Sequence, residues 1–189
     1  MILPVAVLLL IISVPLTGGR LSRLANLEIR WVSAILAALA LQIWVTTVPT
    51  DETLGTVVHL VSYALGIWFI WANRKVPGLL VTSSGGAMNL TAIAVNGGVM
   101  PASPAALELA GVVQDGEHFV NSGAIEGARL AFLGDVFAIP ASWPLANVFS
   151  FGDVVLVVGV GVMLHRVSRQ RDLPEQAPLT TNAVETAEA

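Results

Sequence analysis

Few residues in this sequence have the type and spacing to carry out chemistry. Asp135 and Asp153 could act together as a general acid and a general base, and Arg129 could hold an anionic substrate beside them. The sequence leaves the distance between the two carboxyl groups open, so an enzyme is one hypothesis among several. From the residues alone we assign no catalytic residue.

A local motif gives Asp153 a structural explanation. Ser150 and Asp153 have the Ser-x-x-Asp spacing of a helix capping box, directly before an apolar run. In such a box the serine hydroxyl accepts from a free backbone amide, and the carboxylate lies at the positive end of the helix. We therefore predict that Ser150 and Asp153 cap a helix, and we favour this role over catalysis or ion binding.

Two apolar segments each carry a stripe of polar and small residues on one helical face. Polar side chains at membrane depth avoid lipid, and small residues let two helices approach closely. The stripes predict that residues 54–72 and 78–97 pack against each other, with His59 and Asn89 hydrogen-bonded between them. The first stripe is Gly55, His59, Ser62, Tyr63 and Gly66, and the second is Thr82, Gly85, Gly86, Asn89 and Asn96.

The same polar residues support an alternative, an outward-facing pocket that binds a small ligand or passes an ion. Ionisable side chains inside a membrane are candidates for function. A satisfied hydrogen bond between helices explains the histidine at least as well, so both interpretations stay open. The candidate pocket consists of His59, Asn89, Asn96, Arg129, Asp135 and Asp153.

Metal, cofactor and nucleic-acid sites find no support in the sequence. The histidines lie in distant segments and the chain has no cysteine, so we expect no metal centre. Fingerprints of phosphate loops, dinucleotide sites and metalloproteases do not occur, and we expect no cofactor. With nine basic residues and a net charge of −4, the chain lacks a basic face for nucleic acid.

The composition indicates a membrane protein. Of 189 residues, 55% are apolar and 12% are charged, and the mean hydropathy is +0.78. A soluble domain of this size could not bury so much apolar surface. Since a helix of about 20 apolar residues crosses a bilayer, we predict an all-α polytopic bundle in the lipid bilayer. Its five transmembrane helices are expected at residues 2–16, 31–48, 54–72, 78–97 and 150–167.

Basic residues predict the orientation of these helices. Eight of the nine fall on one side of the predicted membrane, which the positive-inside rule makes the cytoplasm. The N-terminus then lies outside and the C-terminus inside. A signal peptide is the alternative for the first segment, but no charged side chain precedes its apolar run, so we favour an uncleaved anchor. The eight residues are Arg20, Arg23, Arg30, Arg74, Lys75, Arg166, Arg169 and Arg171; Arg129 lies on the other side.

The predicted membrane domain covers residues 1–168 and includes a long outer loop at about residues 98–149. Two short helices are expected in this loop: one begins with Pro104 after a Ser103 cap, and the other runs from about Gly123 to Leu133. Residues 169–189 are rich in Glu, Pro and Thr and predict a disordered cytoplasmic tail.

Several motifs resemble a known family. They are the stretch from Gly86 to Pro101 with its Asn-Gly-Gly-Val-Met-Pro ending, Leu133-Gly134-Asp135, and the stretch from Asn147 to Asp153. Over most of its length, the chain resembles the bacterial family called domain of unknown function 5317. The resemblance implies a bacterial integral membrane protein, and with the predicted spans we expect a multi-pass protein of the bacterial inner membrane. It implies no activity, ligand or catalytic residue.

Three functions are compatible with the sequence. The leading hypothesis is a non-enzymatic component that supports or regulates a membrane-protein partner or assembles with a second copy of itself. The alternative is a small carrier or ligand-binding protein whose polar pocket lies between the third, fourth and fifth helices. The third is an enzyme that uses Asp135 and Asp153 with Arg129.

Overall fold

The structure is a computed structural model that describes residues 2–48, 52–112 and 122–169, most of which are helical. Of the predicted tail, residues 170–189 lie outside the described residues. The helices are α1 (Ile2–Leu16), α2 (Ser22–Ala25), α3 (Val32–Thr47), α4 (Glu52–Ala72), α5 (Leu79–Val95), α6 (Pro104–Ala110) and α7 (Phe151–Ser168), with a 3-10 turn, η1 (Ala131–Leu133). The strands are β1 (Met100–Pro101), β2 (Ser122–Gly123), β3 (Phe137–Ile139) and β4 (Asn147–Phe149).

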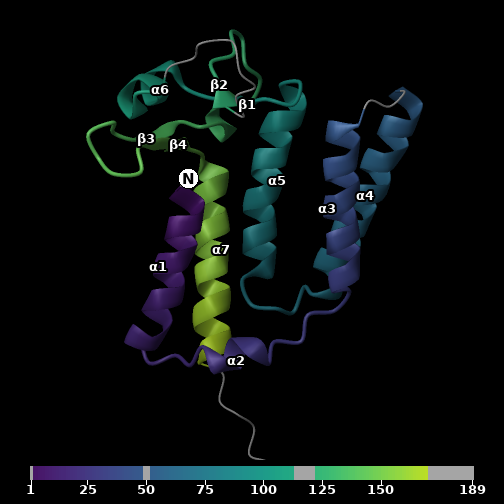
Figure 1. Ribbon diagram of the computed structural model, residues 1–189, viewed down its shortest axis with the longest axis vertical. Coiled ribbons are helices and arrows are strands. Elements are labelled where there is room, and N and C mark those ends of the chain that lie inside the picture. Colours follow the sequence, from purple (N-terminus) through teal and green to yellow (C-terminus); the bar gives the residue numbers. More distant parts are fainter. Residues whose placement is uncertain (1, 49–51, 113–121, 170–189) are drawn as a thin grey trace, which may run out of the picture.

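The long helices α1, α3, α4, α5 and α7 lie side by side, and successive ones run in opposite directions (Figure 1). The strands and α6 gather at one end of the molecule, near the N-terminus; we call this the strand end (residues 96–112 and 122–150). The short helix α2 lies at the opposite end, where α7 finishes. We call that end the arginine end (residues 17–31, 73–78 and 165–169), since it carries most of the basic residues.

The helices lie where the apolar segments predict them, within a few residues at each boundary. α4 and α7 are long and apolar enough to cross a membrane. α1, α3 and α5 are apolar but shorter. The lengths therefore support a membrane protein and agree with five helical segments.

The surface of these helices is strongly apolar. Large side chains such as Leu39, Ile43 and Ile67 are exposed, the last two by 64% and 67%. Almost none of the residues of the apolar stretch in α4 are buried. Burial of apolar area stabilises a protein in water by about 25 cal/mol per Å², so this exposed apolar surface supports a lipid environment.

Glycines bring α5 and α7 into close contact. A Cβ atom added to Gly85 of α5 would lie 2.5 Å from the carbonyl oxygen of Gly152 in α7. A Cβ added to Gly159, two turns further along α7, would overlap the backbone of Thr82. The two backbones therefore approach closely at two levels, as small residues allow in membrane helices.

The second pair of helices is α3 with α4, which pack along their length and form a hairpin. α4 contacts α5 only sparsely. The predicted packing of residues 54–72 against residues 78–97 is therefore wrong. Only part of each stripe forms a helix contact: His59 and Ser62 face α3, and Gly85 and Asn89 face α7. Gly66 and Gly86 have no neighbour within 4 Å of an added Cβ.

The strand end differs in part from the predicted loop with two short helices. α6 occurs as predicted, begins with Pro104 and ends at Gly111, which has a left-handed φ of 67°. The Ser103 side chain makes no capping hydrogen bond. The second predicted helix, from Gly123 to Leu133, is wrong: left-handed residues at Gly127 and Leu130 interrupt it, and only the turn η1 remains.

Two small strand pairs, which the sequence did not predict, organise this end. β1 pairs with β2 in parallel, and β3 pairs with β4 in antiparallel fashion. The ring of Phe137 in β3 stacks on Phe149 in β4 and meets Phe151 at the start of α7 edge-on, with centroids 5.3 and 4.6 Å apart. These aromatic contacts place the β3–β4 hairpin directly over the first turn of α7.

The glycine contact between α5 and α7 yields a matched pair of variants. In Gly85→Ala the new methyl group collides with the backbone of α7, so we expect the free energy of unfolding to fall by about 1–3 kcal/mol. Gly86→Ala is the control, since nothing lies within 4 Å of its added Cβ. It is expected to be neutral or up to about 1 kcal/mol more stable. Thermal unfolding in detergent, followed by circular dichroism, compares them; equal shifts would contradict the close contact.

Candidate functional site

Three polar side chains form a closed hydrogen-bond network where α7 begins. The amide nitrogen of Asn89 in α5 donates to Asp153 Oδ1 at 2.7 Å, and the Ser150 hydroxyl donates to Asn89 Oδ1 at 2.8 Å. Ser150 is fully buried, and the other two are half-buried. The network joins the middle of α5 to the first turn of α7.

The capping box predicted for Ser150 and Asp153 is confirmed. The Ser150 hydroxyl accepts from the backbone amide of Asp153 at 3.0 Å, and Asp153 Oδ2 accepts from the backbone amide of Ser150 at 3.0 Å. Each carboxylate oxygen thus has a donor, one from the cap and one from Asn89. The site residues are therefore held in one geometry before any ligand arrives.

Gly152 explains why Asn89 can reach this position. A Cβ at residue 152 would overlap the side-chain amide of Asn89. Because glycine leaves that space free, the amide lies against the α7 backbone and meets both Ser150 and Asp153. The Ser-x-Gly-Asp sequence thus serves the cap and the neighbouring helix together.

Asn96 and Arg129 are also brought together, through the backbone of the arginine. The Asn96 side chain accepts from the Arg129 amide and donates to the Arg129 carbonyl, both at 2.8 Å, and donates to Ala92 of its own helix. This pairing fastens the turn before η1 to the end of α5. Of the arginine, only the main chain makes this contact with Asn96.

Asp135 belongs to the strand end. Asp135 is buried, with 5% of its surface exposed. Its backbone amide donates to the Pro101 carbonyl at 2.8 Å, and its carbonyl accepts from Ser103 at 3.0 Å. Asp135 therefore holds the start of β3 beside β1 and the start of α6.

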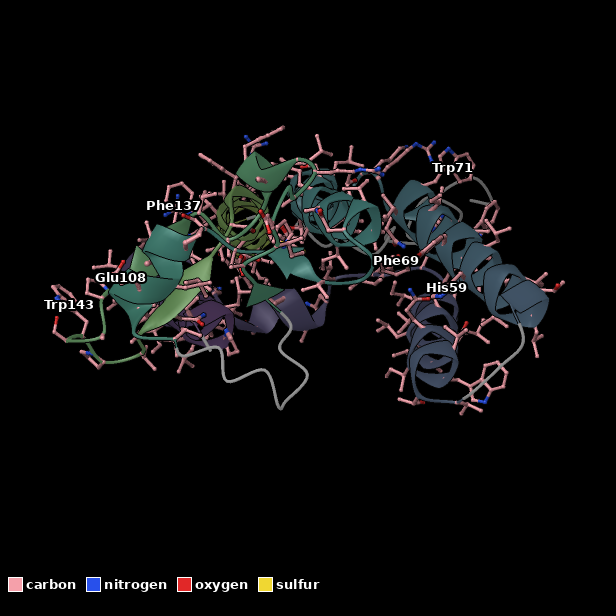
Figure 2. All side chains as sticks on the ribbon, turned by 90° about the horizontal axis from the view of Figure 1, so that it is seen from above. His59, Phe69, Trp71, Glu108, Phe137 and Trp143 are labelled. Carbon is pink, nitrogen blue, oxygen red and sulfur yellow. The ribbon has the colours of Figure 1, made fainter. Side chains whose placement is uncertain are left out.

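His59 lies in a separate network within the α3–α4 hairpin (Figure 2). Its Nδ1 atom is 3.2 Å from Gln42 Oε1, and the buried Ser62 hydroxyl donates to the same oxygen at 2.8 Å. The ring also stacks on Tyr63. The predicted hydrogen bond between His59 and Asn89 is therefore wrong, because His59 pairs with α3 and Asn89 pairs with α7.

The six residues of the candidate pocket thus fall into separate groups. Asn89 with Asp153, and Asn96 with Arg129, are joined by hydrogen bonds, while His59 is engaged in the hairpin. Within the described residues, no group of three histidine, aspartate or glutamate side chains could hold a metal ion. Ligand binding at these positions stays a prediction of the sequence.

An apolar groove runs beside Asp153. It has a volume of about 210 Å³ and lies between α1 and the first half of α7. Asp153 is the acidic residue at its wall, and its oxygens already accept from Asn89 and Ser150. The other lining residues are Ile2, Leu3, Ala6, Phe149, Val154, Val157 and Val158.

Sequence reasoning missed a second asparagine contact of the same kind. Asn73, directly after α4, accepts from the Arg30 amide and donates to the Arg30 carbonyl and to Phe69, all within 2.9 Å. The signal was available: Asn73 and Asn96 each follow the last residue of an apolar helix. Their partners, Arg30 and Arg129, were not predictable, because each of these arginines directly precedes a residue with a left-handed backbone, Trp31 or Leu130.

A second missed feature lies at the arginine end. The two ring nitrogens of His165 lie 3.0 and 3.2 Å from the hydroxyls of Ser13 and Thr17 in α1. Ser13 and Thr17 are four residues apart and therefore share one helical face. That spacing could have marked them as a polar contact surface of an otherwise apolar helix.

Comparison with known proteins identifies the family. Residues 26–165 match the family of unknown function DUF5317. The chain belongs to this family. The match includes α3, α4, α5 and nearly all of α7, so both polar networks lie within the family region.

One relative is an uncharacterized protein of Thermotoga maritima, 29% identical over 114 residues. This match covers 60% of the present chain and 66% of the relative, which is less than two thirds of its length. No solved structure matches the chain. The family assignment thus supplies a relationship, and any role has to be argued from the structure.

The network at the start of α7 generates a direct test. Asn89→Ala leaves the Ser150 hydroxyl and an Asp153 oxygen without their partner, so we expect a loss of about 1–3 kcal/mol in unfolding free energy. Thr91→Ala is the control, since Thr91 is exposed and its hydroxyl bonds only within α5. The yield of monodisperse protein and the unfolding temperature measure both. Unchanged stability of Asn89→Ala would show that the network does not hold α5 to α7.

Proposed function

We propose that the chain is a five-span protein of the bacterial inner membrane, with its N-terminus and strand end outside and its C-terminus inside. The observation that supports this is the distribution of surface types along the helix axes. The middle of the molecule exposes large apolar side chains, and basic residues gather at the arginine end. Apolar area suits the hydrocarbon core, and arginine and lysine favour the cytoplasmic side.

The packing of α1 supports its assignment as a retained span. α1 contacts α7, and the hydroxyls of Ser13 and Thr17 meet His165. Beyond α1, the Arg20 amide donates to the Ser168 carbonyl at 3.0 Å. A cleaved signal peptide would have no reason to provide these contacts to the last helix.

We propose further that the protein is a non-enzymatic component that supports or regulates a membrane partner. Its polar side chains are used in structure: the Asn89 network joins two helices, and the Gln42–His59–Ser62 network joins two others. The α3–α4 hairpin meets α5 only sparsely and exposes apolar side chains. This hairpin is the surface that we assign to a partner helix, with lipid covering the remaining apolar area.

The orientation can be measured by cysteine labelling, since the chain has no native cysteine. Ser142 lies at the strand end and Ser22 at the arginine end, and both are exposed. A membrane-impermeant maleimide should label Ser142→Cys in intact spheroplasts and Ser22→Cys only after permeabilisation. The reverse pattern, or labelling of both in intact spheroplasts, would overturn the proposed topology.

The partner surface can be tested by site-specific photocrosslinking in cells. A photoreactive residue at Ile67 of α4 should give one discrete protein adduct, because this position lies on the hairpin. The same residue at Leu9 of α1, which is 60% exposed, is the control and should give lipid adducts alone. Equal patterns at both positions, together with a strictly monomeric protein in mild detergent, would count against a partner-binding role.

A further inference from the structure

We propose that a groove at the arginine end binds the phosphate group of an anionic phospholipid. The groove has a volume of about 390 Å³ and is lined by Pro77, His165, Arg166 and Arg169. It lies between the turn that leads into α5 and the last turn of α7. This inference rests on the proposed orientation, which places the arginine end at the inner leaflet.

The two arginines of the groove are available to an anion. The Arg166 guanidinium makes no hydrogen bond or ion pair with any described residue, and the residue is exposed. Arg169 donates from one nitrogen to the Thr17 carbonyl at 3.1 Å and keeps its other donors. Neither has a carboxylate partner among the described residues. A guanidinium group offers a planar fork of donors that matches two phosphate oxygens.

The start of α5 adds a second source of positive potential. Pro77 lines the groove, and Gly78 is the N-cap of this 17-residue helix. Gly78 has no side chain that could accept from the amides of the first turn. These amides carry the positive end of the α5 dipole, whereas the last turn of α7 brings the negative end of its own dipole to the same groove. The guanidinium groups therefore supply the main attraction for an anion.

Hydrogen bonds between α1, α2 and α7 fix the walls of the groove. The Ser168 carbonyl accepts from the Arg20 amide and, at 3.2 Å, from the Arg23 guanidinium. The His165 ring is held at both nitrogens by Ser13 and Thr17. The cationic side chains therefore project from a preorganised support, which lowers the entropy lost when a ligand binds.

The charge around the groove also favours an anionic lipid. The described residues of the arginine end include one acidic residue, Glu28. A basic cluster next to a membrane attracts anionic head groups by about 1 kcal/mol for each charge. The basic residues of this end are Arg20, Arg23, Arg30, Arg74, Lys75, Arg166 and Arg169.

The test compares Arg166→Gln with Lys75→Gln in the full-length protein. Both variants remove one exposed charge from the arginine end, but only Arg166 lines the groove. Phosphatidylglycerol and phosphatidylcholine are titrated into the detergent-solubilised protein, and native mass spectrometry gives the bound fraction. We expect phosphatidylglycerol to bind at least about tenfold more tightly to the wild-type protein than to Arg166→Gln. A loss of this size corresponds to one charge-assisted hydrogen bond. Lys75→Gln should change the affinity less than about twofold.

Further measurements separate the ligand source from protein damage. Glycerol phosphate and inorganic phosphate are titrated into the protein, and binding is followed by thermal shift. If either binds saturably and as tightly as the lipid, and Arg166→Gln weakens this binding, the groove is a site for a soluble phosphate and the lipid proposal is overturned. If Arg166→Gln fails to fold, Arg166→Lys replaces it: this variant keeps the charge but loses the planar fork, so it should bind phosphatidylglycerol several-fold more weakly than the wild-type protein. Equal binding of the two lipids, or equal losses in the two Gln variants, would overturn the proposal. Cysteine labelling tests the proposed orientation independently, so a wrong orientation can be distinguished from the absence of a lipid site.

Discussion

The close approach of α5 and α7 is the contact on which the rest of the structure depends. Gly85 and Gly152 let the backbones meet near the strand end, and Gly159 repeats the contact two turns away. Only at this short distance can Asn89 reach across to Ser150 and Asp153. In a low-dielectric interior, satisfied polar groups strengthen the contact, and the same groups left unpaired would oppose it. Glycine packing and the polar network therefore require each other.

Asparagines connect the helices to the loops at both ends. Asn73 holds the backbone of Arg30 at the arginine end, and Asn96 holds the backbone of Arg129 at the strand end. In each case the side-chain amide pairs with a main-chain amide and carbonyl, as a neighbouring strand would. This pairing satisfies backbone groups at helix ends that membrane or protein surroundings would otherwise leave without partners. The α3–α4 hairpin is closed by the first of these contacts, independently of the α5–α7 pair.

The membrane assignment and the distribution of polar groups lead to one picture of the molecule. Polar side chains along the helices are used to join helices in pairs, and the apolar remainder faces outward. The strand end forms a small folded cover over α7 through the rings of Phe137, Phe149 and Phe151. The arginine end presents guanidinium groups around an open groove. The accessible surface of the described residues is therefore largely apolar along the helices and basic at the arginine end.

The five long helices, the family and the cap of α7 could be predicted from the amino-acid sequence. Apolar length is a local property, so the helical segments were predicted within a few residues, and the Ser150–Asp153 box depends only on adjacent residues. Which helix each polar stripe faces depends on how the helices pack. A stripe indicates that a helix contacts another helix, but it does not identify that helix. Residues 123–133 likewise form no α-helix in the folded chain: Asn96 of α5 pairs with the Arg129 backbone, and the next residue, Leu130, is left-handed. Contacts between distant residues, such as His59 with Gln42, likewise depend on which helices are neighbours. Helical periodicity shows which residues share one face of a helix, but not which helix lies beside that face.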